Sequence, residues 1–179
     1  MKTQILGILG GIALLLAAGS VYAGSPRPVK YLAASGCTFI STGITFDGGI
    51  NFASEDTCTS NDNFGFPSTQ GLSAYYDTLT TCTAPDGTPG ELFGLEFSTF
   101  ASTYLFVNDQ IWTYSFDGSI CASDFTGAFA GSTTYTTYGG TGRFTGATGT
   151  STFNATGSYL DRQGNFGRYT STGTGTITP

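Results

Sequence analysis

Few side chains in this 179-residue sequence combine a reactive type with a setting that chemistry could use. The most suggestive carboxylate is Glu96, which stands between Leu95 and Phe97 in a run of alternating apolar residues. A glutamate that faced an apolar interior would have a raised pKa and could act as an acid or a base. The simpler interpretation puts Glu96 on the solvent face of a strand, which the alternation equally allows.

The other candidate ligand-binding residues are one arginine and several aromatic side chains. Arg143 could hold an anionic ligand or pair with a buried carboxylate. Alternatively, it is a rim residue whose guanidinium donates hydrogen bonds to backbone carbonyls. Aromatic side chains at strand spacing could line a cavity, or they could simply form the core. These candidate aromatic residues are Tyr104, Trp112, Tyr114 and Tyr135.

Composition excludes several kinds of chemistry. The sequence has no histidine, which removes Ser-His-Asp and Cys-His nucleophile systems and most zinc or copper sites. We therefore expect no metal and no cofactor. The segment from Asp56 to Asp62 has oxygen ligands but no calcium-loop spacing, and it is interpreted as a polar surface loop. A net charge of −6 makes nucleic acid and anionic membranes improbable partners.

The first 23 residues have the organisation of a secretory signal peptide. Lys2 provides the positive start, Ile5–Ala18 the apolar run, and Val21–Ala23 a cleavage site with small residues. A membrane anchor is the alternative, but the apolar run is short and interrupted by glycines. We expect a secreted or periplasmic protein whose mature chain begins at Gly24 and forms a single domain over residues 24–179.

The four cysteines fit an exported protein with two disulfides. Their spacing resembles neither a redox pair nor a zinc site. Three pairings are possible. We favour Cys58–Cys82, which would close the middle of the chain, together with Cys37–Cys121, which would join early and late strands.

Hydrophobic alternation indicates strands throughout the mature chain, without a sustained helical period. Two stretches lack a strand pattern: a lead-in at Gly24–Gly36 and a polar, turn-rich loop at Ser54–Gly71. Asp117-Gly118 is predicted to be a turn. The expected strands are Thr38–Phe46, Ile50–Ala53, Leu72–Thr83, Leu92–Phe100, Thr103–Val107, Gln110–Phe116, Phe125–Tyr138, Thr150–Leu160 and Phe166–Ile177.

Such a series of short strands is typical of a β-sandwich or a closed up-and-down barrel. An outer-membrane barrel is a further alternative, since such proteins are also rich in glycine and aromatic residues. Against it, the chain ends in Thr-Ile-Thr-Pro rather than in an apolar strand with a terminal aromatic residue.

The segment Gly139–Gly149, GGTGRFTGATG, has five glycines in eleven residues. It lacks the Lys-Ser/Thr pair of a phosphate-binding loop, so it is interpreted as a structural corner between strands. It resembles the Gly-Gly-Thr-Gly-x-Phe segment of dirigent proteins and, more loosely, the matching segment of allene oxide cyclases. That resemblance implies a small antiparallel eight-stranded barrel with a hydrophobic cavity.

Two classes of function follow from these observations. The first is an exported barrel that binds a small apolar ligand without covalent chemistry, and without insertion into a membrane. The second is a dirigent- or cyclase-like catalyst that controls a reactive intermediate by the shape of its cavity. A structural barrel with a filled core remains a third possibility. Whether the protein is an enzyme is left open by the sequence.

Overall fold

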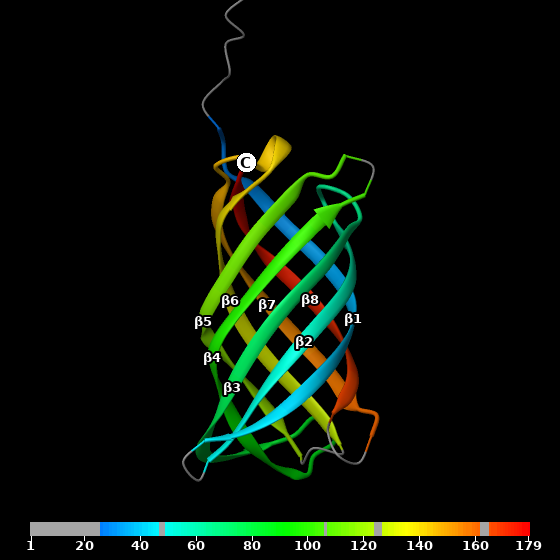
Figure 1. The fold of residues 1–179 in the computed structure, drawn as a ribbon, viewed down its shortest axis with the longest axis vertical. Coiled ribbons are helices and arrows are strands. Elements are labelled where there is room, and N and C mark those ends of the chain that lie inside the picture. Colours follow the sequence, from blue (N-terminus) through cyan, green and yellow to red (C-terminus); the bar gives the residue numbers. More distant parts are fainter. Residues whose placement is uncertain (1–25, 47–48, 106, 124–126, 162–164) are drawn as a thin grey trace, which may run out of the picture.

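The chain folds into a single closed antiparallel barrel of eight strands (Figure 1). The computed structural model describes residues 26–46, 49–105, 107–123, 127–161 and 165–179. The signal peptide predicted at Met1–Ala23 lies outside these residues. The strands are β1 (Val29–Phe46), β2 (Gly49–Asp62), β3 (Pro67–Thr83), β4 (Pro89–Tyr104), β5 (Gln110–Ala122), β6 (Ala128–Gly140), β7 (Thr148–Tyr159) and β8 (Phe166–Thr178). The predicted all-β, eight-stranded barrel is therefore confirmed.

Each strand pairs with the next one in the sequence, and β8 pairs with β1 to close the sheet. In that closing ladder Val29 lies opposite Ile177 at one end and Ile40 lies opposite Phe166 at the other. Closure leaves no strand edge free to pair with another chain. An eight-stranded barrel is just wide enough for its interior to be filled by side chains or to hold one small ligand.

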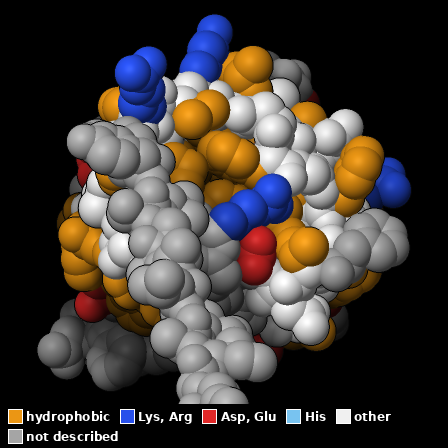
Figure 2. Space-filling view, turned by 90° about the horizontal axis from the view of Figure 1, so that it is seen from above, with side chains coloured by type: hydrophobic (Ala, Val, Ile, Leu, Met, Phe, Trp, Pro, Cys, Tyr) orange, Lys and Arg blue, Asp and Glu red, His pale blue; other side chains and the backbone are white. Residues whose placement is uncertain are grey.

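Two apolar clusters fill the two ends of the barrel. The end that carries the short 3-10 turn η1 (Gly142–Phe144) is filled by Tyr31, Ala33, Tyr104, Ile111, Phe144, Ala147 and Ile177. Figure 2 looks onto this end and shows hydrophobic side chains gathered near its centre. The opposite end is filled by Phe39, Phe52, Phe93, Ile120, Ala122, Phe129 and Tyr159. These clusters supply most of the apolar burial, and they leave a polar layer between them.

Hydroxyl groups of neighbouring strands pair across that middle layer. Ser35 and Ser60 are joined at 2.7 Å, and Thr69 and Ser102 at 2.9 Å. Ser73 and Ser98, both almost fully buried, are joined at 2.8 Å. Pairing satisfies these buried hydroxyls, which would otherwise cost free energy. The interior of the barrel is thus apolar at both ends and polar at its waist.

The stretch predicted to be a long loop, Ser54–Gly71, is mostly strand. β2 runs to Asp62 and β3 starts at Pro67, so that only four residues connect them. The predicted lead-in is also wrong in part, because β1 begins at Val29. These strands were missed because the layer that they face is polar, so that serine and aspartate take inward positions where alternation normally shows apolar residues.

Four register shifts interrupt the described ladders, two between β3 and β4 and two between β5 and β6, and one in each pair bears on a sequence prediction. In the pairing of β3 with β4, Ala74 lies opposite Phe97 and Tyr75 opposite Leu95, so Glu96 is the extra residue of a β-bulge. The bulge separates Phe97 from the inward series that includes Leu95. A second shift, between Tyr114 and Asp117 of β5, replaces the turn predicted at Asp117-Gly118, and the strand continues through it.

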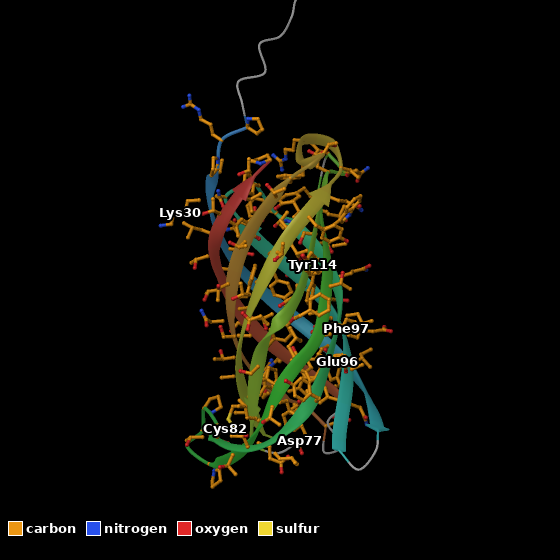
Figure 3. The ribbon with its side chains drawn as sticks, turned by 90° about the vertical axis from the view of Figure 1, so that its left-hand side faces the viewer. Lys30, Asp77, Cys82, Glu96, Phe97 and Tyr114 are labelled. Atoms are coloured by element: carbon orange, nitrogen blue, oxygen red, sulfur yellow. A yellow bond between two sulfur atoms is a disulfide. The ribbon has the colours of Figure 1, made fainter. Side chains whose placement is uncertain are left out.

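The two disulfides differ from the favoured pairing. They join Cys37 to Cys58 and Cys82 to Cys121. Cys37 and Cys58 lie directly opposite each other in the β1–β2 ladder, with Cα atoms 4.1 Å apart. Cys82 lies at the end of the barrel away from η1 (Figure 3), where its bond to Cys121 links β3 to β5. The favoured pairing was wrong because it depended on the missed course of β2.

Candidate functional site in the barrel

The waist of the barrel encloses a cavity of about 130 Å³. Its wall is formed by side chains from all eight strands, so no single segment of the sequence defines it. The polar part of the wall is made of hydroxyl groups and one carboxylate, and the apolar part is mainly aromatic. Members of both apolar clusters also line the cavity, namely Tyr31, Tyr104, Ile111, Ile177, Phe39, Phe52, Ile120, Phe129 and Tyr159. The other lining residues are Ser35, Cys37, Ser54, Asp56, Cys58, Ser60, Thr69, Ser73, Tyr75, Phe100, Ser102, Thr113, Gly131, Thr133, Tyr135, Ser151, Phe153, Ala155, Tyr169 and Ser171.

Asp56 supplies the only carboxylate among the residues that the structure places on the cavity wall. It lies in the middle of β2 and is 6% exposed. Ser54 Oγ donates a hydrogen bond of 3.0 Å to Asp56 Oδ2, and the Tyr169 hydroxyl also bonds to the carboxylate. Burial raises the pKa of Asp56 to about 6, and these two hydrogen bonds only partly oppose that rise.

Three tyrosines from different strands surround Asp56. Tyr75, Tyr135 and Tyr169 come from β3, β6 and β8. Burial raises the pKa of each hydroxyl, and the charge of Asp56 raises each pKa further. All three therefore stay neutral at physiological pH. The Tyr135 hydroxyl also lies 3.1 Å from Ser98 Oγ, and the Tyr169 hydroxyl lies 3.6 Å from Cys58 Sγ.

A second buried carboxylate, Asp62, does not line the cavity but bonds to Tyr104 and Tyr31, which do. Tyr104 donates a short hydrogen bond of 2.6 Å to Asp62, and Tyr31 approaches the same oxygen at 3.4 Å. The other oxygen accepts hydrogen bonds from the backbone N–H groups of Phe64 and Gly65, at 2.8 and 2.9 Å. Asp62 is thus fully occupied in holding the β2–β3 turn against the wall.

Arg143 connects neighbouring turns on the outer side of the η1 end. Its guanidinium lies 3.3 Å from the Asp109 carboxylate and donates a hydrogen bond of 2.9 Å to the Phe64 carbonyl oxygen. It also lies over the rings of Tyr104 and Phe144, 5.0 and 4.7 Å from their centroids. The η1 turn is therefore joined to the β2–β3 and β4–β5 turns by one side chain. The interpretation of Arg143 as a rim residue that bonds to a backbone carbonyl agrees with this geometry.

Of the remaining predicted site residues, some line the cavity and others lie on the outer surface of the barrel. Tyr104 and Tyr135 line the cavity. Glu96 is exposed on the outer face of β4, and Figure 3 labels it beside Phe97. Trp112 and Tyr114 also lie outside, where Trp112 packs against Tyr138. The structure therefore does not bring Glu96, Arg143 and the two outer aromatic residues together at one site.

Sequence reasoning placed Asp56 in a polar surface loop rather than in a cavity, because the part of β2 that follows Ala53 was not recognised as strand. A signal was present in the spacing. From Phe52 to Asp62 every second residue is buried or part-buried and faces the interior, and Cys58 lies within that series. A cysteine that forms a cross-strand disulfide inside a barrel fixes the inward register of its strand. Polar residues two positions away on either side must then face inward as well.

In the described part of the chain, no group of three His, Cys, Asp or Glu side chains could hold a metal ion. Within the same residues, no helix is long and apolar enough to cross a membrane. No protein-family model, curated protein or solved structure matches the chain. The chemistry of the cavity is therefore the basis for assigning a function.

Proposed function

We propose that this protein is an exported binding protein that holds one small ligand inside its barrel. The ligand has an apolar body about the size of one aromatic ring, and it carries a polar group. The observation that carries the proposal is the cavity itself, whose largely aromatic and apolar wall also carries a row of hydroxyl groups and one carboxylate inside a fold of this small width. A core that served only for stability would be filled by apolar side chains. Here the serines, Asp56 and the tyrosines line an open space instead.

The volume limits the size of the ligand. An engineered apolar cavity of roughly 150 Å³ holds one benzene molecule. The cavity of about 130 Å³ is therefore suited to a ligand of about benzene size. Without a ligand it has room for about four water molecules at roughly 30 Å³ each, which the wall hydroxyls could hydrogen-bond. A ligand that reproduces one or two of those hydrogen bonds would displace the water at little cost.

The outer surface and the disulfides support an exported protein in an aqueous setting. The outward positions of β7 and β8 carry Thr148, Thr150, Thr152, Asn154, Thr156, Arg168, Thr170, Thr172, Thr174 and Thr176. A wall that faced lipid all round would present an apolar band on these two strands as well. Exposed apolar and aromatic side chains lie instead on β3, β5 and β6, namely Leu72, Tyr76, Tyr114, Phe116 and Tyr138. Two disulfides suit an oxidising compartment, as the predicted signal peptide at Met1–Ala23 does.

The second candidate function is the dirigent- or cyclase-like catalysis implied by the Gly139–Gly149 resemblance. The observation that favours it is Asp56, since a buried carboxyl with a pKa of about 6 can exchange a proton near neutral pH. The two candidates differ in the fate of the ligand. A binding protein releases it unchanged, whereas a catalyst releases a product of different mass or structure.

A binding experiment with a cavity-filling variant tests the proposal. Ala155 lines the cavity, and its neighbour Thr156 is exposed on the outside. Titration calorimetry with phenol and with benzyl alcohol should show binding to the wild type and to Thr156→Phe. Ala155→Phe, which places a ring in the cavity, should lose at least tenfold in affinity. Equal binding by Ala155→Phe, or no binding of any benzene-sized probe by the wild type, would contradict the proposal.

A further inference from the structure

We propose that the cavity selects a small organic cation, a protonated amine on a benzene-sized body, and that Asp56 is the counter-ion of its ammonium group. This inference rests on the proposed binding function and names the class of ligand. It follows from three features of the cavity wall: a carboxylate without a cationic partner, unused hydrogen-bonding capacity on that carboxylate, and a surrounding set of aromatic rings.

The first feature is the charge of the wall. In the described part of the chain, the cavity-lining residues include Asp56 but no lysine and no arginine. Arg143, which lies over the ring of the lining residue Tyr104, is paired with Asp109 on the outer side of the η1 end. A buried carboxylate is costly unless it is paired. A ligand that brings a positive charge removes that cost, whereas an anionic ligand increases it.

The second feature is the unused capacity of the Asp56 carboxylate. An ionised carboxylate accepts about four hydrogen bonds. Asp62, the other buried carboxylate, receives four donors from Tyr31, Tyr104 and two backbone N–H groups. Asp56 receives two donors, from Ser54 and Tyr169. Two acceptor positions are thus left for a ligand, and an ammonium group carries three donors.

The third feature is the aromatic surroundings. The negative charge of Asp56 raises the pKa values of Tyr75, Tyr135 and Tyr169, which share the cavity wall with it. A cation close to the face of an aromatic ring is attracted by the ring quadrupole, and more strongly where water is excluded. Tyrosine hydroxyls can also accept hydrogen bonds from an ammonium group. Phe52, stacked on Tyr75 at 4.8 Å, belongs to the apolar cluster that would bury the ligand body.

A metal cation is a poorer match for the same wall. Calcium takes six to eight oxygen ligands and usually several carboxylates, and magnesium keeps an octahedral shell. Asp56 is one carboxylate, and Asp62 is held in the turn contacts already described. A bare metal ion would make no favourable contact with the apolar clusters at the two ends. An organic amine can pair with the carboxylate and also pack against the aromatic rings.

Binding of an amine should depend on pH, because only ionised Asp56 attracts it. The titratable groups that face Asp56 across the cavity are Tyr75 on β3, Tyr135 on β6 and Tyr169 on β8, with Tyr159 of β7 at the cavity wall. Burial raises the pKa of each of these hydroxyls above its usual value, so none ionises between pH 5 and pH 8. The affinity should therefore rise with pH through the pKa of Asp56, about 6.

The test compares benzylamine with benzyl alcohol, which is nearly isosteric but neutral, and with benzoate. Calorimetric titrations would use the wild type, Asp56→Asn and the matched control Glu55→Gln, whose side chain is exposed on the neighbouring position of β2. At pH 8 we expect the wild type and Glu55→Gln to bind benzylamine at least tenfold more tightly than benzyl alcohol, and benzoate least. Asp56→Asn should lose at least tenfold for benzylamine while its affinity for benzyl alcohol changes less than threefold.

Equal affinity of the wild type for the amine and the alcohol, with no effect of Asp56→Asn, would overturn the inference and leave the binding proposal intact. No binding of either compound would overturn both. If Asp56→Asn does not fold, the wild type alone decides the matter. Its benzylamine affinity should increase about five- to tenfold from pH 5 to pH 8 as Asp56 ionises, against a flat profile for benzyl alcohol. A flat profile for both compounds, or competition by calcium chloride alone at millimolar concentration, would contradict the amine assignment.

Discussion

Replacing Asp56 with asparagine should make the empty protein more stable at neutral pH. Burial raises the pKa of Asp56 from 3.8 to about 6, so the folded protein holds this proton more tightly than the unfolded chain does. The contribution of this group to stability is therefore fully present below about pH 4 and is lost as the pH rises through 6. A difference of about two pKa units corresponds to about 3 kcal/mol in the free energy of unfolding.

The assay is urea unfolding of wild type, Asp56→Asn and Glu55→Gln between pH 4 and pH 8, in buffers that contain no amine. The stability of Asp56→Asn relative to wild type should increase with pH by up to about 3 kcal/mol, or about 6–12 °C in melting temperature for a chain of this size. Glu55→Gln, exposed on the outer face, should show no such trend. A stability difference between Asp56→Asn and wild type that is independent of pH would refute the reasoning.

Three further predictions concern the frame of the site. Peptide mapping without reduction should recover Cys37–Cys58 and Cys82–Cys121; closing loops of 21 and 39 residues, the two bonds should contribute about 3 and 4 kcal/mol. Gly142→Ala should cost about 2 kcal/mol in thermal melts, because Gly142 has a φ of 59° and an added Cβ would meet the Asp109 carboxylate. Gly146→Ala, also at positive φ but in open space, should cost about 1 kcal/mol; equal losses would contradict this. Mass spectrometry of the exported protein should find Gly24 at its N-terminus.

The fold was predictable from the sequence because it depends on local alternation and turns. β7 and β8 alternate threonine on the outside with small or apolar residues inside, and the segment after Gly139 contains glycines at positive φ where a corner needs them. Alternation along a strand and glycines at a turn are local features that involve only one or two neighbouring strands. They require no knowledge of which strands meet across the barrel.

The site was not predictable in the same way. Asp56 owes its raised pKa to burial in the interior, and the side chains that share its cavity, among them Tyr75, Tyr135 and Tyr169, come from three other strands and meet only when the barrel closes. The bulge in β4 shows another limit of the sequence. Alternation favoured the solvent face for Glu96, where the structure also has it, but the extra residue in the ladder turns Phe97 away from the inward series that includes Leu95. The position of a bulge cannot be predicted from the alternation of apolar residues in a single sequence.

The most direct test of the site is the titration of the Asp56 carboxyl carbon by NMR, with and without saturating benzylamine. The empty protein should show a pKa near 6. If ionised Asp56 binds the amine at least tenfold more tightly than the protonated form does, then linkage requires the pKa to fall by about one unit or more when the amine is bound. Benzyl alcohol, which brings no charge, should not lower it. A pKa of Asp56 that benzylamine leaves unchanged would contradict the assignment of this cavity as a site for a cationic ligand.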